Sequence, residues 1–180
     1  MMAKAEKLAN RLIGDYETNI DSKGRVGLGR FRQHFDESVI AVRMPGYLMI
    51  LTPKQFDVIS EGIRMRTSFS SEQNVYKLFD MDMQLFKRHF YANAFEVSLD
   101  SQGRMTIPKK MRENLNLVED VVWVGCGDTL ELWQAKQYEK NFMLWEHEGG
   151  PGRMSSVLTA PEAPAGVNDG DPGGTGERDQ

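Results

Sequence analysis

Two short segments of this 180-residue chain share one pattern of charged and turn-forming residues, Asp-Ser-x-Gly-Arg. The first segment runs from Asp21 to Arg25, and the second runs from Asp100 to Arg104. In such a pattern the aspartate can accept backbone N–H groups of a turn, and the glycine can adopt a positive φ angle. The arginine can bind a phosphate or donate two hydrogen bonds to guanine. The chemistry that the pattern offers is therefore anion binding at an exposed turn.

Further basic residues follow both turns, so the sequence predicts two basic clusters. The eight candidate contacts to a nucleic acid are Lys23, Arg25, Arg30, Arg32, Arg104, Lys109, Lys110 and Arg112. The formal net charge of the whole chain is −4, which neither favours nor excludes such a partner, whereas the local clusters favour an anionic one. A purely structural interpretation is also open, in which the aspartates brace the turns and the motif arginines pair with carboxylates.

Residue types that catalyse reactions or bind metals are few and scattered. His34, His89 and His147 do not stand at the spacing of a metal site, and Cys126 has no evident partner base. The sequence contains no phosphate-binding loop of the Walker or dinucleotide kind. We therefore expect a protein that is not an enzyme and that uses no metal and no cofactor.

Cysteine content and hydropathy indicate the compartment. A single cysteine excludes a disulfide bond within the chain and favours a reducing environment. No apolar run approaches the ~20 residues of a membrane span, and the first ten residues lack the apolar stretch of a signal peptide. We expect a cytoplasmic protein without a membrane partner.

The two turns belong to a longer duplication, in which each copy predicts the order strand, turn, strand, helix, two strands and helix. Downstream of the turns, Leu48–Phe56 matches Leu130–Tyr138. Copies of about 40 residues are near the lower limit for folding alone, so we expect them to share a core. The expected boundaries are 15–55 for the first copy, 56–92 for a helical connector, 93–137 for the second copy, 138–148 for a C-terminal helix and 149–180 for a disordered tail.

These motifs resemble the paired Asp-x-x-x-Arg motifs of MraZ, a family of bacterial transcriptional regulators in the wider AbrB-like superfamily. The resemblance covers about residues 12–147 and rests on the two turns, on Met105–Pro108 and on Leu130–Trp133. It implies an α+β fold, an AbrB-like swapped-hairpin β-barrel made from two tandem, pseudo-symmetric repeats with connecting helices. The two halves of one chain would then mimic a dimer.

The resemblance also implies a function. Chains of this family assemble into rings, bind short direct repeats upstream of their own gene, at the head of the division and cell-wall cluster, and repress it. The expected partners are therefore double-stranded DNA and further copies of the chain, with a nucleoid-associated location.

Site residues carry over by position in the motif. Arg25 and Arg104 are the expected DNA contacts, and the other six basic residues are additions to them. The residues expected to hold or permit the turns are Asp21, Gly24, Asp100 and Gly103.

One position departs from the family pattern. The first copy has Gly29 where the second copy has Pro108 and where the family has proline, so we expect its helix to be less rigid or to start later. In the connector, a set of apolar residues could line a small-molecule pocket, but a core or subunit interface is favoured. These residues are Phe79, Met81, Met83, Phe86 and Phe90.

Two other functions stay open. A scaffolding ring could use basic turns to bind acidic protein partners, whereas DNA binding would fall steeply as salt rises. An antitoxin of the same superfamily would need a C-terminal segment that folds on a toxin, and residues 149–180 lack the apolar anchors for that.

Overall fold

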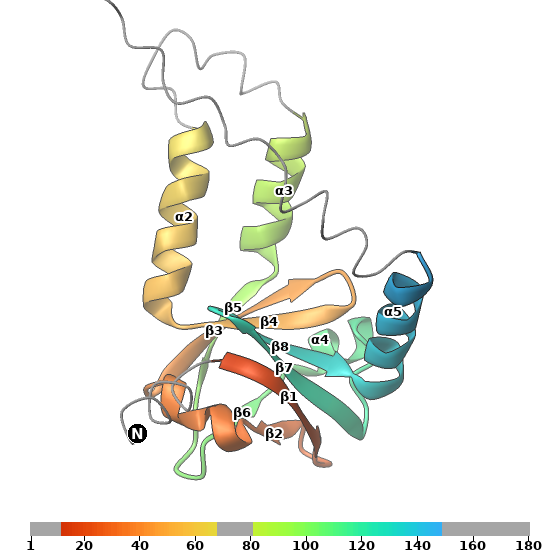
Figure 1. Cartoon of the computed structure of the whole chain (residues 1–180). Helices are drawn as coiled ribbons and strands as arrows, with labels where there is room; N and C mark the ends of the chain where they lie inside the picture. Colours follow the sequence, from red (N-terminus) through yellow and green to blue (C-terminus); the bar gives the residue numbers. More distant parts are fainter. Residues whose placement is uncertain (1–11, 68–80, 149–180) are drawn as a thin grey trace, which may run out of the picture. The chain divides into compact units, whose positions relative to one another are not determined.

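Two antiparallel sheets and their covering helices make up the computed structural model, which describes residues 12–67 and 81–148 (Figure 1). The first copy comprises β1 (Leu12–Asn19), β2 (Arg25–Gly27), the 3₁₀ helix η1 (Gly29–His34), β3 (Ser38–Met44), β4 (Tyr47–Leu51) and α2 (Pro53–Thr67). Helix α3 (Met81–Ala92) comes next in the chain. The second copy comprises β5 (Ala94–Ser98), β6 (Arg104–Thr106), α4 (Lys109–Asn114), β7 (Asp120–Gly127), β8 (Leu130–Gln134) and α5 (Ala135–His147). The predicted α+β class is confirmed.

The chain divides into two units, and the strands all lie in the first, which ends at Asn141. From Phe142 onward, α5 belongs to the second unit, where Phe142 and Trp145 lie against each other with ring centroids 6.0 Å apart. The predicted tail, 149–180, lies outside the described residues. Within residues 12–67 and 81–148, no helix has the length and apolar character that crossing a membrane requires.

Strand pairing exchanges elements between the two copies. The large sheet has the order β1-β7-β8-β4-β3-β5, so the first strand of each copy pairs with the third strand of the other. The small sheet is a ribbon of one strand from each copy, β2 and β6. Because the large sheet is open, with β1 and β5 at its edges, the closed barrel remains a prediction.

The register of pairing shows that the two copies are related by a pseudo-twofold axis. In the ribbon Val26 pairs with Met105, and in the large sheet Met49 pairs with Glu131. Each pair joins equivalent positions of the two copies, as a twofold axis through both pairs requires. The two motif turns, which precede β2 and β6, are therefore related by the same axis.

The two copies share one apolar core on one face of the large sheet. Val26 and Met105 of the ribbon are fully buried there together with Trp123 of β7. The indole Nε1–H of Trp123 donates a hydrogen bond of 2.8 Å to the carbonyl of Gly27. This bond ties the ribbon to the large sheet, and so it fixes the position of both turns.

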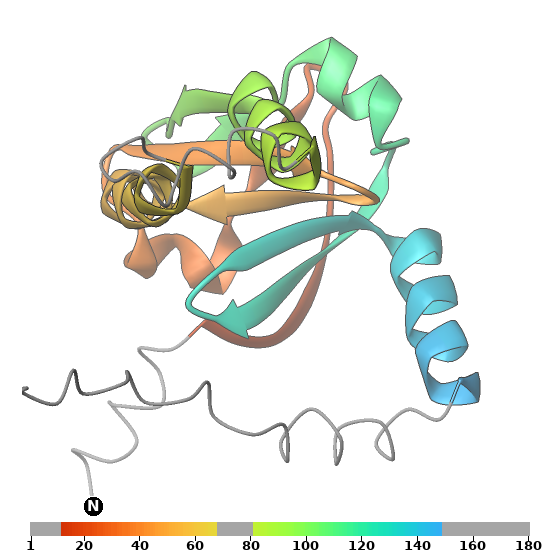
Figure 2. The ribbon, with the colours of Figure 1, turned by 90° about the horizontal axis from the view of Figure 1, so that it is seen from above.

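Helices α2 and α3 cover the opposite face, over β3 and β4 (Figure 2). Alternate side chains of β3 point to opposite faces of the sheet, since Ala41 is buried in the shared core and Val42 is buried under the helices. Phe90 of α3 stacks on Phe56 of α2 with ring centroids 5.4 Å apart. The two helices therefore pack on the sheet, away from the ribbon.

Gly29 differs from its counterpart Pro108 for a steric reason. Its φ angle is +53°, and a Cβ atom at this position would lie 2.5 Å from the ring of Tyr16. Proline, whose φ is fixed near −65°, cannot adopt this conformation. The expectation of a later helix start is wrong, because η1 begins at Gly29 itself. The two helices differ in type instead, since η1 is a 3₁₀ helix and α4 is an α-helix.

We expect Gly29→Ala to lower the free energy of unfolding by about 1–2 kcal/mol, because the alanine would be strained at positive φ and would displace Tyr16. Gly62→Ala is the matched control. A Cβ at Gly62, which lies in α2, has nothing within 4 Å, so this change should stabilise by up to about 1 kcal/mol. Urea unfolding followed by circular dichroism measures both, and equal effects of the two changes would contradict the role of Tyr16.

Candidate nucleic-acid interface

The first motif turn is held by a single carboxylate. Oδ1 of Asp21 accepts hydrogen bonds from the backbone N–H groups of Lys23 and Arg25, both at 2.9 Å. Oδ2 of Asp21 accepts one from Nε of Arg25 at 2.7 Å and lies 2.6 Å from its Nη2. Gly24, with φ at +78°, closes the turn by donating its N–H to the carbonyl of Asp21 at 2.8 Å.

The second turn repeats these bonds. Oδ1 of Asp100 accepts the N–H groups of Gln102 and Arg104 at 2.9 Å, and Oδ2 binds Nε and Nη2 of Arg104, both at 2.8 Å. Gly103 has φ at +70° and donates to the carbonyl of Asp100 at 2.8 Å. Asp100 and Gly103 therefore hold the second turn in the same way as Asp21 and Gly24 hold the first.

Both motif arginines have one occupied and one available edge. The Nε–Nη2 edge of Arg25 and of Arg104 binds the aspartate, and about 30% of each side chain is exposed. Among the described residues, Nη1 of neither arginine has a hydrogen-bond acceptor. The Nη1 group of each arginine can therefore donate hydrogen bonds to a phosphate or a base, although the charge of the arginine is already balanced by its aspartate.

The ion pair also changes the acidity of the carboxylates. Hydrogen bonding to the Arg25 side chain lowers the pKa of Asp21 to about 2, and the backbone N–H of Arg104 is the first cause of a lowered pKa at Asp100. Because the pKa is lower in the folded chain, the ionised turn contributes stability above the ordinary pKa of 3.8. This contribution is lost as pH falls toward about 2.

We expect a carbon-13 NMR titration to place the midpoint of Asp21 near pH 2. In Arg25→Gln the midpoint should move up toward the ordinary value of 3.8, because the side-chain hydrogen bond is lost. Lys109→Gln, a change at an exposed lysine of α4, is the control and should leave the midpoint unchanged. A midpoint near 3.8 in the unaltered chain would refute the bracing role of the ion pair.

The ribbon presents both motif arginines on one surface. Val26 and Met105 point into the core, so their neighbours Arg25 and Arg104 lie on the opposite, outer face. Arg25 pairs with Thr106, which places Arg104 at the diagonal position, and diagonal neighbours are roughly 7–8 Å apart. A single groove of a duplex can meet both.

Each turn also receives an arginine from the other copy. A Cβ atom on Gly24 would lie 2.6 Å from Nε of Arg112, and one on Gly103 would lie 2.6 Å from Cδ of Arg32. The motif glycines therefore leave room for an arginine side chain, besides permitting the turn. Two basic clusters result, the first made of Lys23, Arg25 and Arg112, and the second of Arg32 and Arg104.

The arginines that come from the other copy keep their charge available. Nε of Arg112 donates to the carbonyl of Ile107 at 3.2 Å, and Nη1 of Arg32 donates to the carbonyl of Phe35. A carbonyl fixes the guanidinium but does not neutralise it. Among residues 12–67 and 81–148 neither Arg32 nor Arg112 forms an ion pair, so both contribute positive charge next to the turns.

The three remaining residues predicted to contact DNA, Arg30, Lys109 and Lys110, lie outside the two basic clusters. Arg30 does not join a cluster, since its Nη2 donates to the carbonyls of Asp15 at 2.7 Å and Ile13 at 3.2 Å and so holds β1 around Gly14. Lys109 lies 3.7 Å from Glu113 within α4, and Lys110 beside it is exposed.

Cys126 and the histidines offer no catalytic arrangement. Cys126 is an exposed residue, but partial desolvation of its thiol, together with Glu131, raises the pKa to about 11, so the thiol is protonated at neutral pH. His89 contacts the carbonyl of Arg43 at 3.1 Å in a structural role. In the part of the chain that the structure describes, no group of three potential ligands could hold a metal ion.

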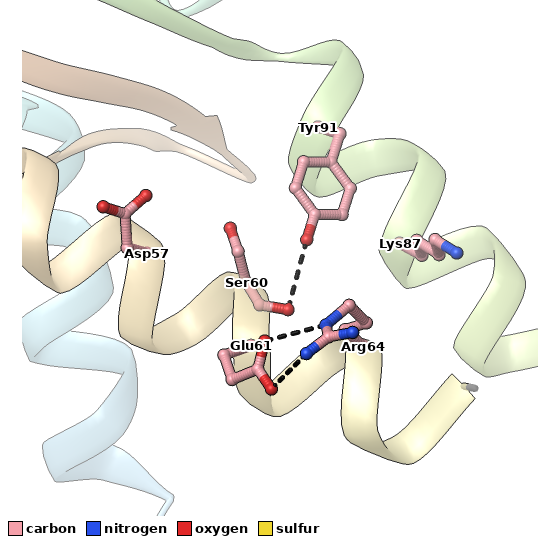
Figure 3. Close-up of a pocket in the computed structure, with 6 residues that line it drawn as sticks. All are labelled: Asp57, Ser60, Glu61, Arg64, Lys87 and Tyr91. Atoms are coloured by element: carbon pink, nitrogen blue, oxygen red, sulfur yellow. Dashed lines mark hydrogen bonds and ion pairs between the residues drawn. The ribbon is translucent and has the colours of Figure 1, made fainter. Parts of the chain in front are cut away.

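A hollow of 460 Å³ lies between α2 and α3 (Figure 3). Its lining is Asp57, Ser60, Glu61, Arg64, Lys87 and Tyr91. Tyr91 donates to the carbonyl of Ser60 at 3.4 Å, and Glu61 binds Arg64 at 2.6 and 2.8 Å. Its lining consists of charged and hydroxyl-bearing residues, so it is not a pocket formed by the apolar residues of the connector.

The apolar connector residues divide between core and surface. Phe90 is buried, whereas Met81 and Phe86 are exposed, and Met83 is half-buried. Phe79 lies outside the described residues.

Comparison with known proteins gives one consistent result. A family model described as "MraZ protein, putative antitoxin-like" matches residues 90–144, which include the second turn and Arg112. The chain is 32% identical over 130 residues to the "Transcriptional regulator MraZ" of Mycoplasmoides gallisepticum, covering 71% of this chain and 84% of that protein. It is 33% identical over 132 residues to the protein of the same name from Treponema denticola, covering 72% and 85%. The corresponding protein of Caldanaerobacter subterraneus subsp. tengcongensis is 30% identical over 131 residues, with coverage of 72% and 85%.

Proposed function

This chain belongs to the MraZ family and is a transcriptional regulator, not an enzyme, and from that premise we propose that it represses transcription by placing the outer face of the β2–β6 ribbon on double-stranded DNA. The observation that carries this proposal is the pair of symmetry-related turns, each with a braced motif arginine and an uncompensated arginine from the other copy. Fixed guanidinium groups lose little entropy on binding, which favours specific contacts over a diffuse basic surface.

The roles of the basic residues follow from their settings. Arg25 and Arg104 lie on the ribbon with one edge available, and we assign base contacts to them. Lys23, Arg32 and Arg112 lie at the turns with uncompensated charge, and we assign phosphate contacts to them. Lys109 and Lys110 extend this surface along α4, whereas Arg30 holds β1.

The expected target is the regulator's own promoter. We propose that it binds short direct repeats there, at the head of the division and cell-wall cluster, within a cytoplasmic, nucleoid-associated complex. The exchange of strands between the copies supports the AbrB-like swapped-hairpin arrangement. Barrel closure is part of the same proposal.

Assembly of several chains into a ring completes the proposal. Apolar side chains exposed on α2 and α3 support it, because a surface of this kind is typical of a protein interface. They are Val58, Met65, Met81, Leu85, Phe86 and Tyr91. The ribbon lies on the opposite face of the large sheet, so assembly through these helices leaves both turns accessible.

The test is a fluorescence anisotropy titration of labelled DNA from upstream of the gene, against a scrambled duplex, at two salt concentrations. Tight binding to the native fragment alone, weakening steeply with salt, is the expected result. Equal and weak binding to both duplexes would contradict the proposal and favour the scaffolding ring, whose basic turns would bind acidic proteins.

A further inference from the structure

The two turns have the same backbone but different side chains at one position. Lys23 and Gln102 each donate the backbone N–H at 2.9 Å to Oδ1 of the turn aspartate. Both side chains are exposed. The two positions are therefore equivalent under the pseudo-twofold axis in backbone geometry, and only their chemistry differs.

This difference matters for the recognition of a base pair. The ammonium group of lysine has three donors and no acceptor, so it binds phosphates or the acceptors of guanine. The amide of glutamine has a donor and an acceptor, and it matches N7 and the N6 amino group of adenine in the major groove. Lys23 cannot make this paired contact with adenine, and Gln102 can.

Symmetry then determines the kind of DNA sequence that one chain reads. Two identical turns related by a twofold axis would match an inverted repeat, in which both half-sites are the same. Two turns with different side chains match two different half-sites, and the chain then binds in one direction only. Direct repeats have such a direction, whereas an inverted repeat does not.

We infer that Gln102 is a specificity-determining residue that reads an adenine, and that its difference from Lys23 makes one chain recognise a directional sequence and not an inverted repeat. The inference rests on the proposed binding of DNA by the ribbon face. Gln102 was not among the contacts expected from the sequence, because it carries no charge. The equivalence of its backbone to that of Lys23 is the signal that identifies it.

The test is selection of binding sites from a random duplex library by the full-length chain and by Lys23→Gln. The unaltered chain should select a motif that differs from its own reverse complement. Lys23→Gln makes both turns alike, and it should select an inverted repeat with an adenine in each half. Lys54→Gln, at an exposed position of α2, is the control and should select the original motif.

A second measurement uses 7-deazaadenine, which lacks the N7 acceptor. Replacing the adenine read by Gln102 should weaken binding of the unaltered chain about tenfold, with no further loss in Gln102→Ala. The inference is overturned if Lys23→Gln selects the original motif, or if the modified adenine weakens both proteins equally. If the unaltered chain enriches no motif, the proposed function itself fails, which is a separate result.

Discussion

Trp123→Ala should lower the free energy of unfolding by about 3–5 kcal/mol, a large part of the stability of a domain of this size. Trp123 is fully buried in the core that the two copies share, so its removal leaves a cavity between them. The change also leaves the part-buried carbonyl of Gly27 without the indole N–H at 2.8 Å, which adds the cost of a lost hydrogen bond. Both losses act on the contact between the ribbon and the large sheet.

Guanidinium unfolding followed by circular dichroism at a fixed chain concentration measures this effect. Trp123→Phe is the matched variant, because it keeps an aromatic ring but lacks the N–H donor. It should cost less than alanine, and the difference between the two variants separates packing from the hydrogen bond. A loss below 1 kcal/mol in Trp123→Ala would show that the two copies do not depend on a common core.

Local signals in the sequence predicted several elements closely. The apolar run before Pro53 predicts a strand over Tyr47–Leu51, and the observed β4 has these bounds. Pro108 is favourable at a helix start and predicts a helix over Lys109–Leu115, and the observed α4 is Lys109–Asn114. The motif turns also have the expected geometry, since aspartate and glycine form such turns without distant contacts.

The full extent of strands that depend on distant pairing was not predicted. The two glycines of Gly125–Asp128 predict a turn, but β7 continues to Gly127 because β1 begins at Leu12 and pairs along it. The backbone of Leu12 lies so close to Gly125 that a Cβ atom there would collide with it. This glycine is required by contact between strands and not by a turn, which a local pattern cannot distinguish.

The same limit applies to the candidate site. The sequence identified the basic residues, but it could not show that Asp21 and Asp100 neutralise the motif arginines of their own turns. It also could not place Arg32 and Arg112, because each packs on a glycine of the other copy. The sequence does show that in each copy an arginine follows the turn glycine. Which glycine that arginine packs on becomes clear only from the exchange of strands between the copies.

The second large effect concerns Arg32 and Arg112, which we expect to supply phosphate contacts. The double variant Arg32→Met, Arg112→Met keeps an apolar side chain over each glycine and removes both charges. Binding to a duplex with one repeat should weaken about 60-fold at 0.1 M salt, and the slope of log affinity against log salt should become shallower by about 1.8, because two fewer counterions are displaced. Anisotropy titrations from low to high salt give both quantities.

The control variant is Lys87→Met, Arg88→Met, which removes two charges from α3. This helix lies on the face of the large sheet opposite to the ribbon, so affinity and salt slope should stay close to those of the unaltered chain. If both double variants lower the slope equally, the protein binds DNA by its general charge and not by the ribbon face. Size-exclusion chromatography of each variant separates lost contacts from lost assembly.

A third outcome would distinguish phosphate binding by Arg32 and Arg112 from a role in positioning the turns. If the Arg32 and Arg112 variant loses affinity while its salt slope stays unchanged, these arginines act by positioning the turns, since phosphate contacts must release counterions. The motif arginines would then carry the binding alone, although each is already paired with an aspartate. An ion pair within the protein cannot neutralise a phosphate fully, so we expect the slope to fall.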